Sequence, residues 1–301
     1  MPEDIRDISY IGHKDVVALN FVRNPCPYAF RRHFRQGLRS HIMEILRPSD
    51  LELEKNGMLR DGVQWFPRAR PHKIFRIFRT RLKTLEKALE EIGRVKIVEE
   101  YLAPEYLAKS EEFIVDYQGP ESRDLMLCGF QEYVAGHILD PWGILDSTGL
   151  GEVMYASLCK SSDSGGSTRS RWLEKARLEA DAFIGRIKRM IIEREHVPDL
   201  AGVGNLVMVV SGKIRLVDMN NISRANMDSQ IRLDDRGYPV CDKSIEALSL
   251  LERNLLGRPV DRDEPIYRHF LNPRRLKAVQ AIEEVFYGKI KSAPMLDKKE
   301  V

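Results

Sequence analysis

The sequence has few cysteines and no long apolar run, and each absence excludes a class of protein. Its four cysteines share no metal-ligand spacing, so we expect reduced structural thiols rather than a disulfide framework or a zinc site; they are Cys26, Cys128, Cys159 and Cys241. No apolar run approaches the roughly 20 residues that span a bilayer. The first residues do not resemble a secretory signal. These features predict a cytoplasmic protein without a membrane span.

Strong net charge and internal repeats are also absent. The net charge of +3 over 301 residues does not indicate a globally basic, nucleic-acid-coating protein. No repeat at a solenoid period is visible, which argues against a repeat architecture. A chain of this length with 43% hydrophobic residues is long enough to bury a large core and to form two lobes.

Positive charge is concentrated in the first third of the chain. Between Arg23 and Arg81 there are fourteen Lys and Arg residues against five Asp and Glu. Aromatic residues alternate with these cations: Tyr28, Phe30, Phe34, Trp65, Phe66, Phe75 and Phe78. Such a segment predicts an anionic partner: a nucleic acid, a phosphorylated ligand such as a sugar lipid, an acidic protein, or the phosphates of a nucleotide. The alternative is a solvated charged face whose aromatic residues belong to the core.

A short apolar hairpin with polar residues at its open end follows in the second half. Leu206–Val210 and Lys213–Val217 are apolar, β-branched-rich runs separated by a Ser-Gly dipeptide, a two-residue connection typical of tight hairpins. This pairing places Asn205 and Asp218 together. Amide and carboxylate oxygens suit Mg²⁺, which keeps water and substrate phosphates as its other ligands. The alternative is that Asn205 forms a turn and Asp218 only ends a strand.

The spacing of these residues resembles the catalytic and metal-binding loops of the protein-kinase-like superfamily. In kinases, H-R-D-L-x-x-x-N precedes a hairpin and the D-F-G aspartate. The corresponding residues here are His196, Asp199, Asn205 and Asp218, and the thirteen-residue step from Asn205 to Asp218 matches the family. Five residues separate Asp199 from Asn205 where the family has four. Either the intervening segment absorbs an insertion, or Asp199 is not the equivalent of the catalytic aspartate.

This resemblance implies a chemistry and a set of cofactors. The cofactors are ATP and Mg²⁺, with Asn205 and Asp218 as metal ligands. Asp199 would orient or deprotonate the hydroxyl group of the acceptor. The acceptor itself is not specified by these residues, because kinase-like folds draw specificity from the surface around the site.

A second stretch, Leu125–Gly136, resembles the last N-lobe strand and hinge of a kinase. It contains the string E-Y-V-A-G. The resemblance implies that the backbone carbonyl of Glu132 and the backbone N–H of Val134 bind adenine. The alternative is an ordinary buried strand that ends at the glycine. Apolar residues at helical spacing in 171–195 predict the long helix that precedes a kinase catalytic loop.

The N-terminal third lacks the glycine-rich loop and the V-A-I-K strand of kinases. Lys73 is the candidate for the lysine that pairs the ATP phosphates, with Lys14 and Lys55 as alternatives. Gly12 is the single glycine of the candidate phosphate loop, Y-I-G-H-K.

One long helix is expected after Lys73. Apolar residues recur at helical spacing from Ile74 to Ile92, and Gly93 is expected to end the helix. Glu86 or Glu90 would then be the partner of the phosphate-pairing lysine, unless each is only a solvated helix charge.

The sequence therefore predicts an α+β protein with a two-lobed protein-kinase-like fold. The N-lobe, residues 1–131, would hold an antiparallel sheet and one long helix, and the mainly helical C-lobe would comprise residues 132–301. The expected function is Mg²⁺/ATP-dependent phosphotransfer. The alternatives are a catalytically inactive pseudokinase-type binding module and a nucleic-acid-binding protein that uses the basic first third.

Overall fold

The structure, a computed structural model, describes residues 3–34, 37, 39–120, 123–143, 154–156 and 169–292. It divides into two compact units. The first comprises Met1–Lys96 and Leu107–Ala135, and the second comprises Ile97–Tyr106 and Gly136–Val301. The division thus falls after residue 135 rather than after residue 131, and residues 97–106 belong to the second unit. Cys159 lies outside the described residues.

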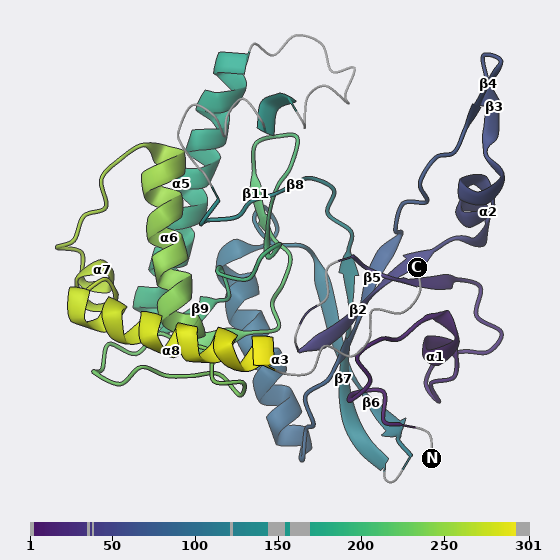
Figure 1. The fold of residues 1–301 in the computed structure, drawn as a ribbon, viewed down its shortest axis with the longest axis horizontal. Helices are drawn as coiled ribbons and strands as arrows, with labels where there is room; N and C mark the ends of the chain where they lie inside the picture. The colour runs from purple at the N-terminus through teal and green to yellow at the C-terminus, as the bar shows by residue number, and fades with distance from the viewer. Residues whose placement is uncertain are drawn as a thin grey trace. The chain divides into compact units, whose positions relative to one another are not determined.

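The first unit is built on a five-stranded antiparallel sheet (Figure 1). Its strands in spatial order are β1 (Ala29–Arg32), β2 (Ser40–Leu46), β5 (Lys73–Phe78), β7 (Arg123–Glu132) and β6 (Ser110–Gln118). Alternating side chains give the sheet two different faces. One face packs Met43, Phe75, Ile77 and Met126 against the N-terminal segment and the short helix α1 (His13–Val17).

The opposite face of the sheet packs against α3 (Leu85–Leu102). Phe78 and Leu127 contact Ala88 of this helix in a small apolar cluster. The same face contains a buried ion pair between Arg76 of β5 and Glu112 of β6. Both residues lie opposite Gly129 of the intervening strand β7. Since Gly129 has no side chain, the Arg76 guanidinium can reach across β7 to Glu112.

The prediction of one helix over residues 74–92 is wrong for its first part. Residues 73–78 form β5 instead, and α3 begins at Leu85 and continues through Gly93 to Leu102. In β5 the apolar residues lie on both faces of a central strand. Their spacing in the sequence therefore matches that of an amphipathic helix, although the segment is a strand. Gly93 does not end α3, because buried apolar side chains continue beyond it at Val95 and Val98.

An arm without buried residues connects β2 to β5. It consists of α2 (Pro48–Asn56) and the hairpin of β3 (Met58–Arg60) and β4 (Val63–Trp65), which project from the sheet in Figure 1. Its attachment is polar: Glu54 accepts hydrogen bonds from Arg31 and from the backbone N–H of Ala69.

The second unit is mainly helical. Its long helix, α5 (Arg169–Arg194), confirms the helix expected over 171–195, and its buried stripe includes Ala180, Phe183, Ile187 and Met190. The stripe packs against α6 (Val240–Leu256), which ends at Gly257 with a left-handed φ of +67°. Two further helices follow, α7 (Pro265–Phe270) and α8 (Pro273–Ser292).

Two small antiparallel sheets complete the second unit. One has the order β11 (Ile214–Leu216), β10 (Leu206–Met208) and β8 (His137–Ile138), and the other pairs β12 (Ile222–Arg224) with β9 (His196–Pro198). The β10–β11 hairpin confirms the prediction, although its loop has three residues. Val209 N–H donates to the Lys213 carbonyl at 2.9 Å, and Gly212 takes the left-handed position with φ +85°.

These elements show an α+β protein with antiparallel sheets and several helices, as predicted. In the part of the chain that the structure describes, no helix has the length and apolar character needed to cross a membrane.

Candidate active site

The ends of two strand pairs in the second unit bring Asp199, Asn205 and Asp218 together. The β9–β12 pairing continues for one residue beyond the strands, because Asp199 N–H donates to the Asn221 carbonyl at 2.9 Å. The β10–β11 pairing likewise extends to Val217, whose N–H donates to the Asn205 carbonyl at 2.8 Å. Asp218, which follows Val217, therefore lies at the open end of the hairpin, as expected from the sequence.

The loop between Asp199 and Asn205 forms a tight turn. Oδ1 of Asp199 accepts hydrogen bonds from the backbone N–H groups of Ala201 and Gly202 at 2.9 and 3.0 Å. The Asn205 backbone N–H donates to the Gly202 carbonyl, and its side-chain amide donates to the Asp199 carbonyl at 2.8 Å. This turn holds Asp199 and Asn205 in direct contact although five residues separate them.

Asp218 and Asn205 each retain a side-chain oxygen that accepts no hydrogen bond from a described residue. Asp199 uses Oδ1 in its turn, and Asp218 uses Oδ1 to accept from the Asn220 N–H at 2.9 Å. Asn205 uses its amide nitrogen as a donor, so its amide oxygen is available as a ligand. Among the described residues neither Asp199 nor Asp218 forms an ion pair.

The pKa of Asp199 reflects its burial and the nearby carboxylate of Asp218. Burial, followed by the nearby carboxylate of Asp218, raises the pKa of Asp199 to about 6, while hydrogen bonds from Gly202, Ala201 and Asn205 act in the opposite direction. A carboxylate with a pKa near the working pH suits general-base catalysis. Repulsion between two unneutralised carboxylates also favours a bound cation at this position.

The donor atoms fit a hard divalent cation with an incomplete protein shell. Two carboxylates and one amide oxygen are the ligand types that Mg²⁺ accepts, together with water and phosphate oxygens. Within the described ranges no cluster of three or more His, Cys, Asp or Glu side chains could hold a metal ion. Asn205 and Asp218 could therefore hold Mg²⁺ only with further ligands from a substrate or from water.

Two residues that support this loop were not identified from the sequence. Ser244 of α6 is fully buried, and its hydroxyl accepts a hydrogen bond from the Leu200 N–H at 3.1 Å. Asn221 anchors Asp199 through its carbonyl and donates its side-chain amide to Asp234 at 3.2 Å. No sequence signal links Ser244 to this loop, which lies 44 residues earlier in the chain.

Lys73 is the first residue of β5 in the first unit, on the face opposite α3. Its ammonium nitrogen lies 5.8 Å from the centroid of the Phe130 ring. It therefore does not face the glutamates of α3, where the sequence placed its partner. Glu86 is exposed, and Glu90 pairs with Lys87 at 2.8 Å.

The other lysine candidates and the candidate phosphate loop lie outside the sheet. Lys14 belongs to α1 and Lys55 to α2. Gly12 precedes α1 rather than connecting two strands.

The predicted adenine contacts, Glu132 and Val134, lie at and just after the end of β7. The Glu132 N–H donates to the Lys109 carbonyl at 2.9 Å, and its carboxylate accepts from the Lys109 N–H at 2.8 Å. The backbone N–H of Val134 donates to no described residue. Adenine binding by these backbone groups stays a prediction.

The basic segment 23–81 does not form one uniform surface. Arg31 is paired with Glu44 and Glu54, Arg76 is buried against Glu112, and the aromatic residues Phe30, Phe75 and Phe78 are core residues. By contrast, Phe34, Trp65 and Phe66 are exposed. An anionic partner for this region stays a prediction, carried by only part of the segment.

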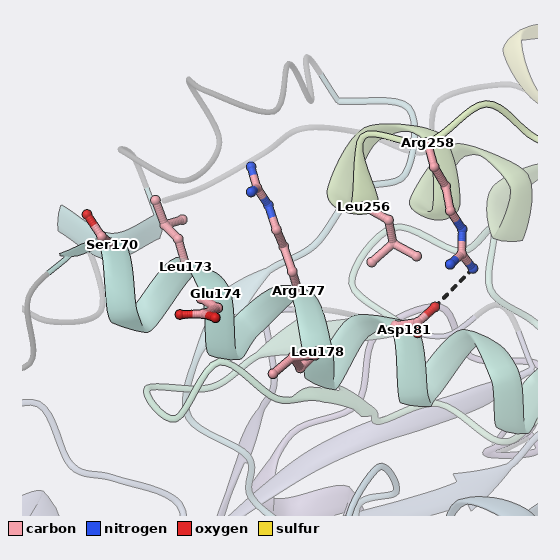
Figure 2. Close-up of a pocket in the computed structure, with 8 residues that line it drawn as sticks. All are labelled: Ser170, Leu173, Glu174, Arg177, Leu178, Asp181, Leu256 and Arg258. Atoms are coloured by element: carbon pink, nitrogen blue, oxygen red, sulfur yellow. Dashed lines mark ion pairs between the residues drawn. The ribbon is translucent and has the colours of Figure 1, made fainter.

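A hollow of about 510 Å³ also lies along α5 (Figure 2). It is lined by Ser170, Leu173, Glu174, Arg177, Leu178, Asp181, Leu256 and Arg258. Arg258 pairs with Asp181 at 2.9 Å, and the lining carries charges of both signs. None of the residues predicted from the sequence lines this hollow, so it is not part of the candidate site.

Comparison with protein-family models finds no match to the chain, and a search of curated proteins finds none either. Function is therefore inferred from the residues of the site.

Proposed function

We propose that this protein is a Mg²⁺/ATP-dependent phosphotransferase that acts on a hydroxyl acceptor. Asp218 and Asn205 would be the metal ligands, and Asp199 would orient or deprotonate the acceptor hydroxyl. Bound Mg²⁺ would neutralise charge on the transferring phosphates. Chemistry of this kind depends on positioning and charge neutralisation more than on covalent catalysis.

One observation carries the proposal. Two carboxylates without a cationic partner among the described residues meet an asparagine whose amide oxygen is available as a ligand, at the adjoining ends of two strand pairs. A purely structural turn would not need the second carboxylate, which raises the pKa of the first. A divalent cation with phosphate ligands would relieve this repulsion.

The order of elements in the first unit supports a kinase-like fold. Three sheet strands precede the long helix α3, two follow it, and the last strand leads into the segment predicted to be the hinge. In kinases the third strand carries a lysine that pairs with a helix glutamate. Here the third strand of the sheet carries Arg76, and its partner is Glu112 of strand β6. Both members of the pair thus differ from the kinase pattern.

That difference supports a second candidate function, a kinase-shaped module that binds a nucleotide without transferring phosphate. Arg76 is buried in its ion pair, and Lys73 lies on the sheet face opposite α3. No described lysine therefore occupies the position of the phosphate-pairing lysine. A module of this kind would bind ATP with little dependence on Mg²⁺.

Calorimetric titration with ATP, with and without Mg²⁺, separates the two functions. Wild-type protein is expected to bind ATP in a Mg²⁺-dependent manner, and Asp218→Asn is expected to weaken this binding by at least about 100-fold, because loss of a ligand exceeds the 10–100-fold effect of an outer-shell change. The asparagine keeps an oxygen that accepts the Asn220 N–H. The local turn should therefore remain.

Asp261→Asn is a matched control for this experiment. Asp261 also accepts the N–H of the residue two positions later, at 2.9 Å, but it is exposed and outside the candidate site. This variant should bind Mg²⁺ and ATP like wild type. Mg²⁺-independent binding that survives Asp218→Asn would favour the binding module, and no ATP binding by wild type would exclude both functions.

Gly202→Ala should impair the same site without removing a charge. A Cβ atom at residue 202 would lie 2.8 Å from both Cγ and Oδ1 of Asn205, so the amide would have to move. We expect the Mg²⁺ concentration for half-maximal ATP binding to rise by about 10–100-fold. Val203→Ala is the control, because the Val203 side chain is 75% exposed. An unchanged Mg²⁺ requirement in Gly202→Ala would argue against Asn205 as a ligand.

A further inference from the structure

A cavity of about 450 Å³ lies in the first unit, on the sheet face opposite α3. Its volume is in the range of small-molecule binding sites, about 300–1,000 Å³. Strands β1, β2, β5, β6 and β7 supply its floor, and the segment Phe21–Tyr28 forms one side. None of its lining residues belongs to the loops that carry Asp199, Asn205 and Asp218.

The floor of the cavity is aromatic. Phe75 lies between Phe30 and Phe130, with ring centroids 6.1 and 5.2 Å away, and Phe113 lies 5.1 Å beyond Phe130. Phe30 and Phe75 are buried, whereas Phe113 and Phe130 are only partly buried. The cavity therefore offers apolar surface that the protein itself does not fully cover.

Cationic and titratable nitrogen groups lie among the other lining residues. Arg23, His72 and Lys73 are all exposed, and no described residue with a carboxylate lines the cavity. Among the described residues neither Arg23 nor Lys73 forms an ion pair. Glu132 is the cross-strand neighbour of Lys73, but its carboxylate accepts from the Lys109 backbone N–H. The positive charge of Arg23 and Lys73 is thus not neutralised by the lining.

We propose that this cavity binds an amphipathic anion, a molecule with an apolar body and a single carboxylate or phosphate head. The apolar body lies on the phenylalanine floor, where its burial removes apolar surface from water. The head group lies beside Arg23 and Lys73, whose long side chains keep their charges in solvent. An uncharged ligand would use only the floor, and a cationic one would be repelled.

Calorimetric titration with dodecanoate, kept below its micelle concentration, tests the proposal. Dodecyl phosphate distinguishes the two head groups, and dodecanol and dodecyltrimethylammonium are the matched uncharged and cationic probes. We expect an anionic probe to bind about tenfold more tightly than dodecanol, because each exposed ion pair contributes a few-fold in affinity. The cationic probe should bind most weakly.

Two variants locate the binding. Arg23→Met with Lys73→Met should reduce dodecanoate affinity about tenfold and leave dodecanol affinity unchanged, whereas Lys83→Met, an exposed lysine outside the cavity, should change neither. Val115→Trp should abolish the binding of both dodecanoate and dodecanol, because the larger side chain would fill the cavity. Equal affinity for all four probes, or unchanged dodecanoate binding in the double variant, would overturn the proposal.

A chemical readout covers the case in which Val115→Trp does not fold. Cys26 lines the cavity and is partly buried, whereas Cys128 and Cys241 are buried. Dodecanoate should slow the reaction of Cys26 with N-ethylmaleimide in wild-type protein, as measured on the Cys26 peptide by mass spectrometry. Binding by calorimetry without protection of Cys26 would place the ligand elsewhere, and absence of binding in wild type would exclude the site.

Discussion

Asp199→Asn is expected to slow Mg²⁺-dependent phosphotransfer by about 10²–10⁴-fold, the typical contribution of a general base. Asparagine cannot accept the proton of the acceptor hydroxyl. Its side-chain oxygen can still accept the N–H groups of Ala201 and Gly202, which Asp199 now holds at 2.9 and 3.0 Å. The loss should therefore appear in turnover. It is measured as Mg²⁺-dependent ATP hydrolysis, with water as acceptor, and as transfer to a panel of hydroxyl compounds.

The pH profile gives a second readout for Asp199. Burial and the Asp218 carboxylate raise its pKa to about 6, and a bound cation would lower this value. A base acts when deprotonated, so wild-type turnover should rise with pH and level off at or below about pH 6. The residual turnover of Asp199→Asn should not show this rise with pH.

At neutral pH, Asp199→Asn should raise the free energy of unfolding although it lowers turnover. Because the folded-state pKa of Asp199 lies above its ordinary value of 3.8, its contribution to stability is fully present below about pH 4 and is lost as pH rises through about 6. At neutral pH Asp199→Asn should thus unfold no more easily than wild type, with a gain on the order of 1–2 kcal/mol after solvent screening. Urea unfolding at pH 4 and pH 7.5 measures this difference.

Asp261→Asn is again the control, with wild-type turnover and stability expected. An Asp199→Asn variant that retains full turnover would show that Asp199 is not the base. A variant with lower stability at neutral pH would show that the carboxylate supports the fold rather than the reaction.

Arg76→Met is expected to reduce the free energy of unfolding by about 3–5 kcal/mol, the effect of leaving a buried charge without its partner. The side chains of Arg76 and Glu112 are only 2% and 1% exposed. Glu112 also accepts a hydrogen bond from the Ser110 hydroxyl at 2.7 Å, which would not replace the guanidinium charge. Urea unfolding followed by circular dichroism measures the change.

The double variant Arg76→Met/Glu112→Leu distinguishes the ion pair from simple packing. If the single variant is destabilised by an unpaired buried carboxylate, removal of that carboxylate should recover much of the loss. Lys87→Met removes one member of an exposed pair with Glu90 and should change stability by less than about 1 kcal/mol. If the stability loss of the double variant equals the sum of the losses of the two single variants, the effect is assigned to lost packing.

The spacing of apolar residues in the sequence was sufficient to predict elements that are buried on one side only. The helix α5 was predicted over nearly its full length because its apolar residues follow one stripe, from Ala176 to Ile191. The β10–β11 hairpin was predicted for a similar reason, since two apolar runs flank a glycine that takes a left-handed φ. The α+β class follows from such segments.

Local pattern failed where a segment is buried on both sides. The strand β5 presents Phe75 and Ile77 to one face of the sheet and Phe78 to the other. Periodicity cannot separate such a strand from a helix, because both faces are apolar. The predicted pairing of Lys73 with a glutamate of α3 failed because Lys73 lies on the sheet face opposite that helix. The ion pair of Arg76 and Glu112 was equally invisible, since it joins residues 36 positions apart across a third strand.

The sequence by itself determined the hairpin that places Asn205 beside Asp218. Only the tertiary structure decided that Asp199 lies in contact with Asn205. Its position depends on the β9–β12 pairing and on the Asn221 carbonyl, a contact 22 residues away that no local propensity encodes. The structure likewise gathered Arg23 and Lys73 around one cavity, because strand pairing, unlike helix formation, joins segments that are distant in the chain.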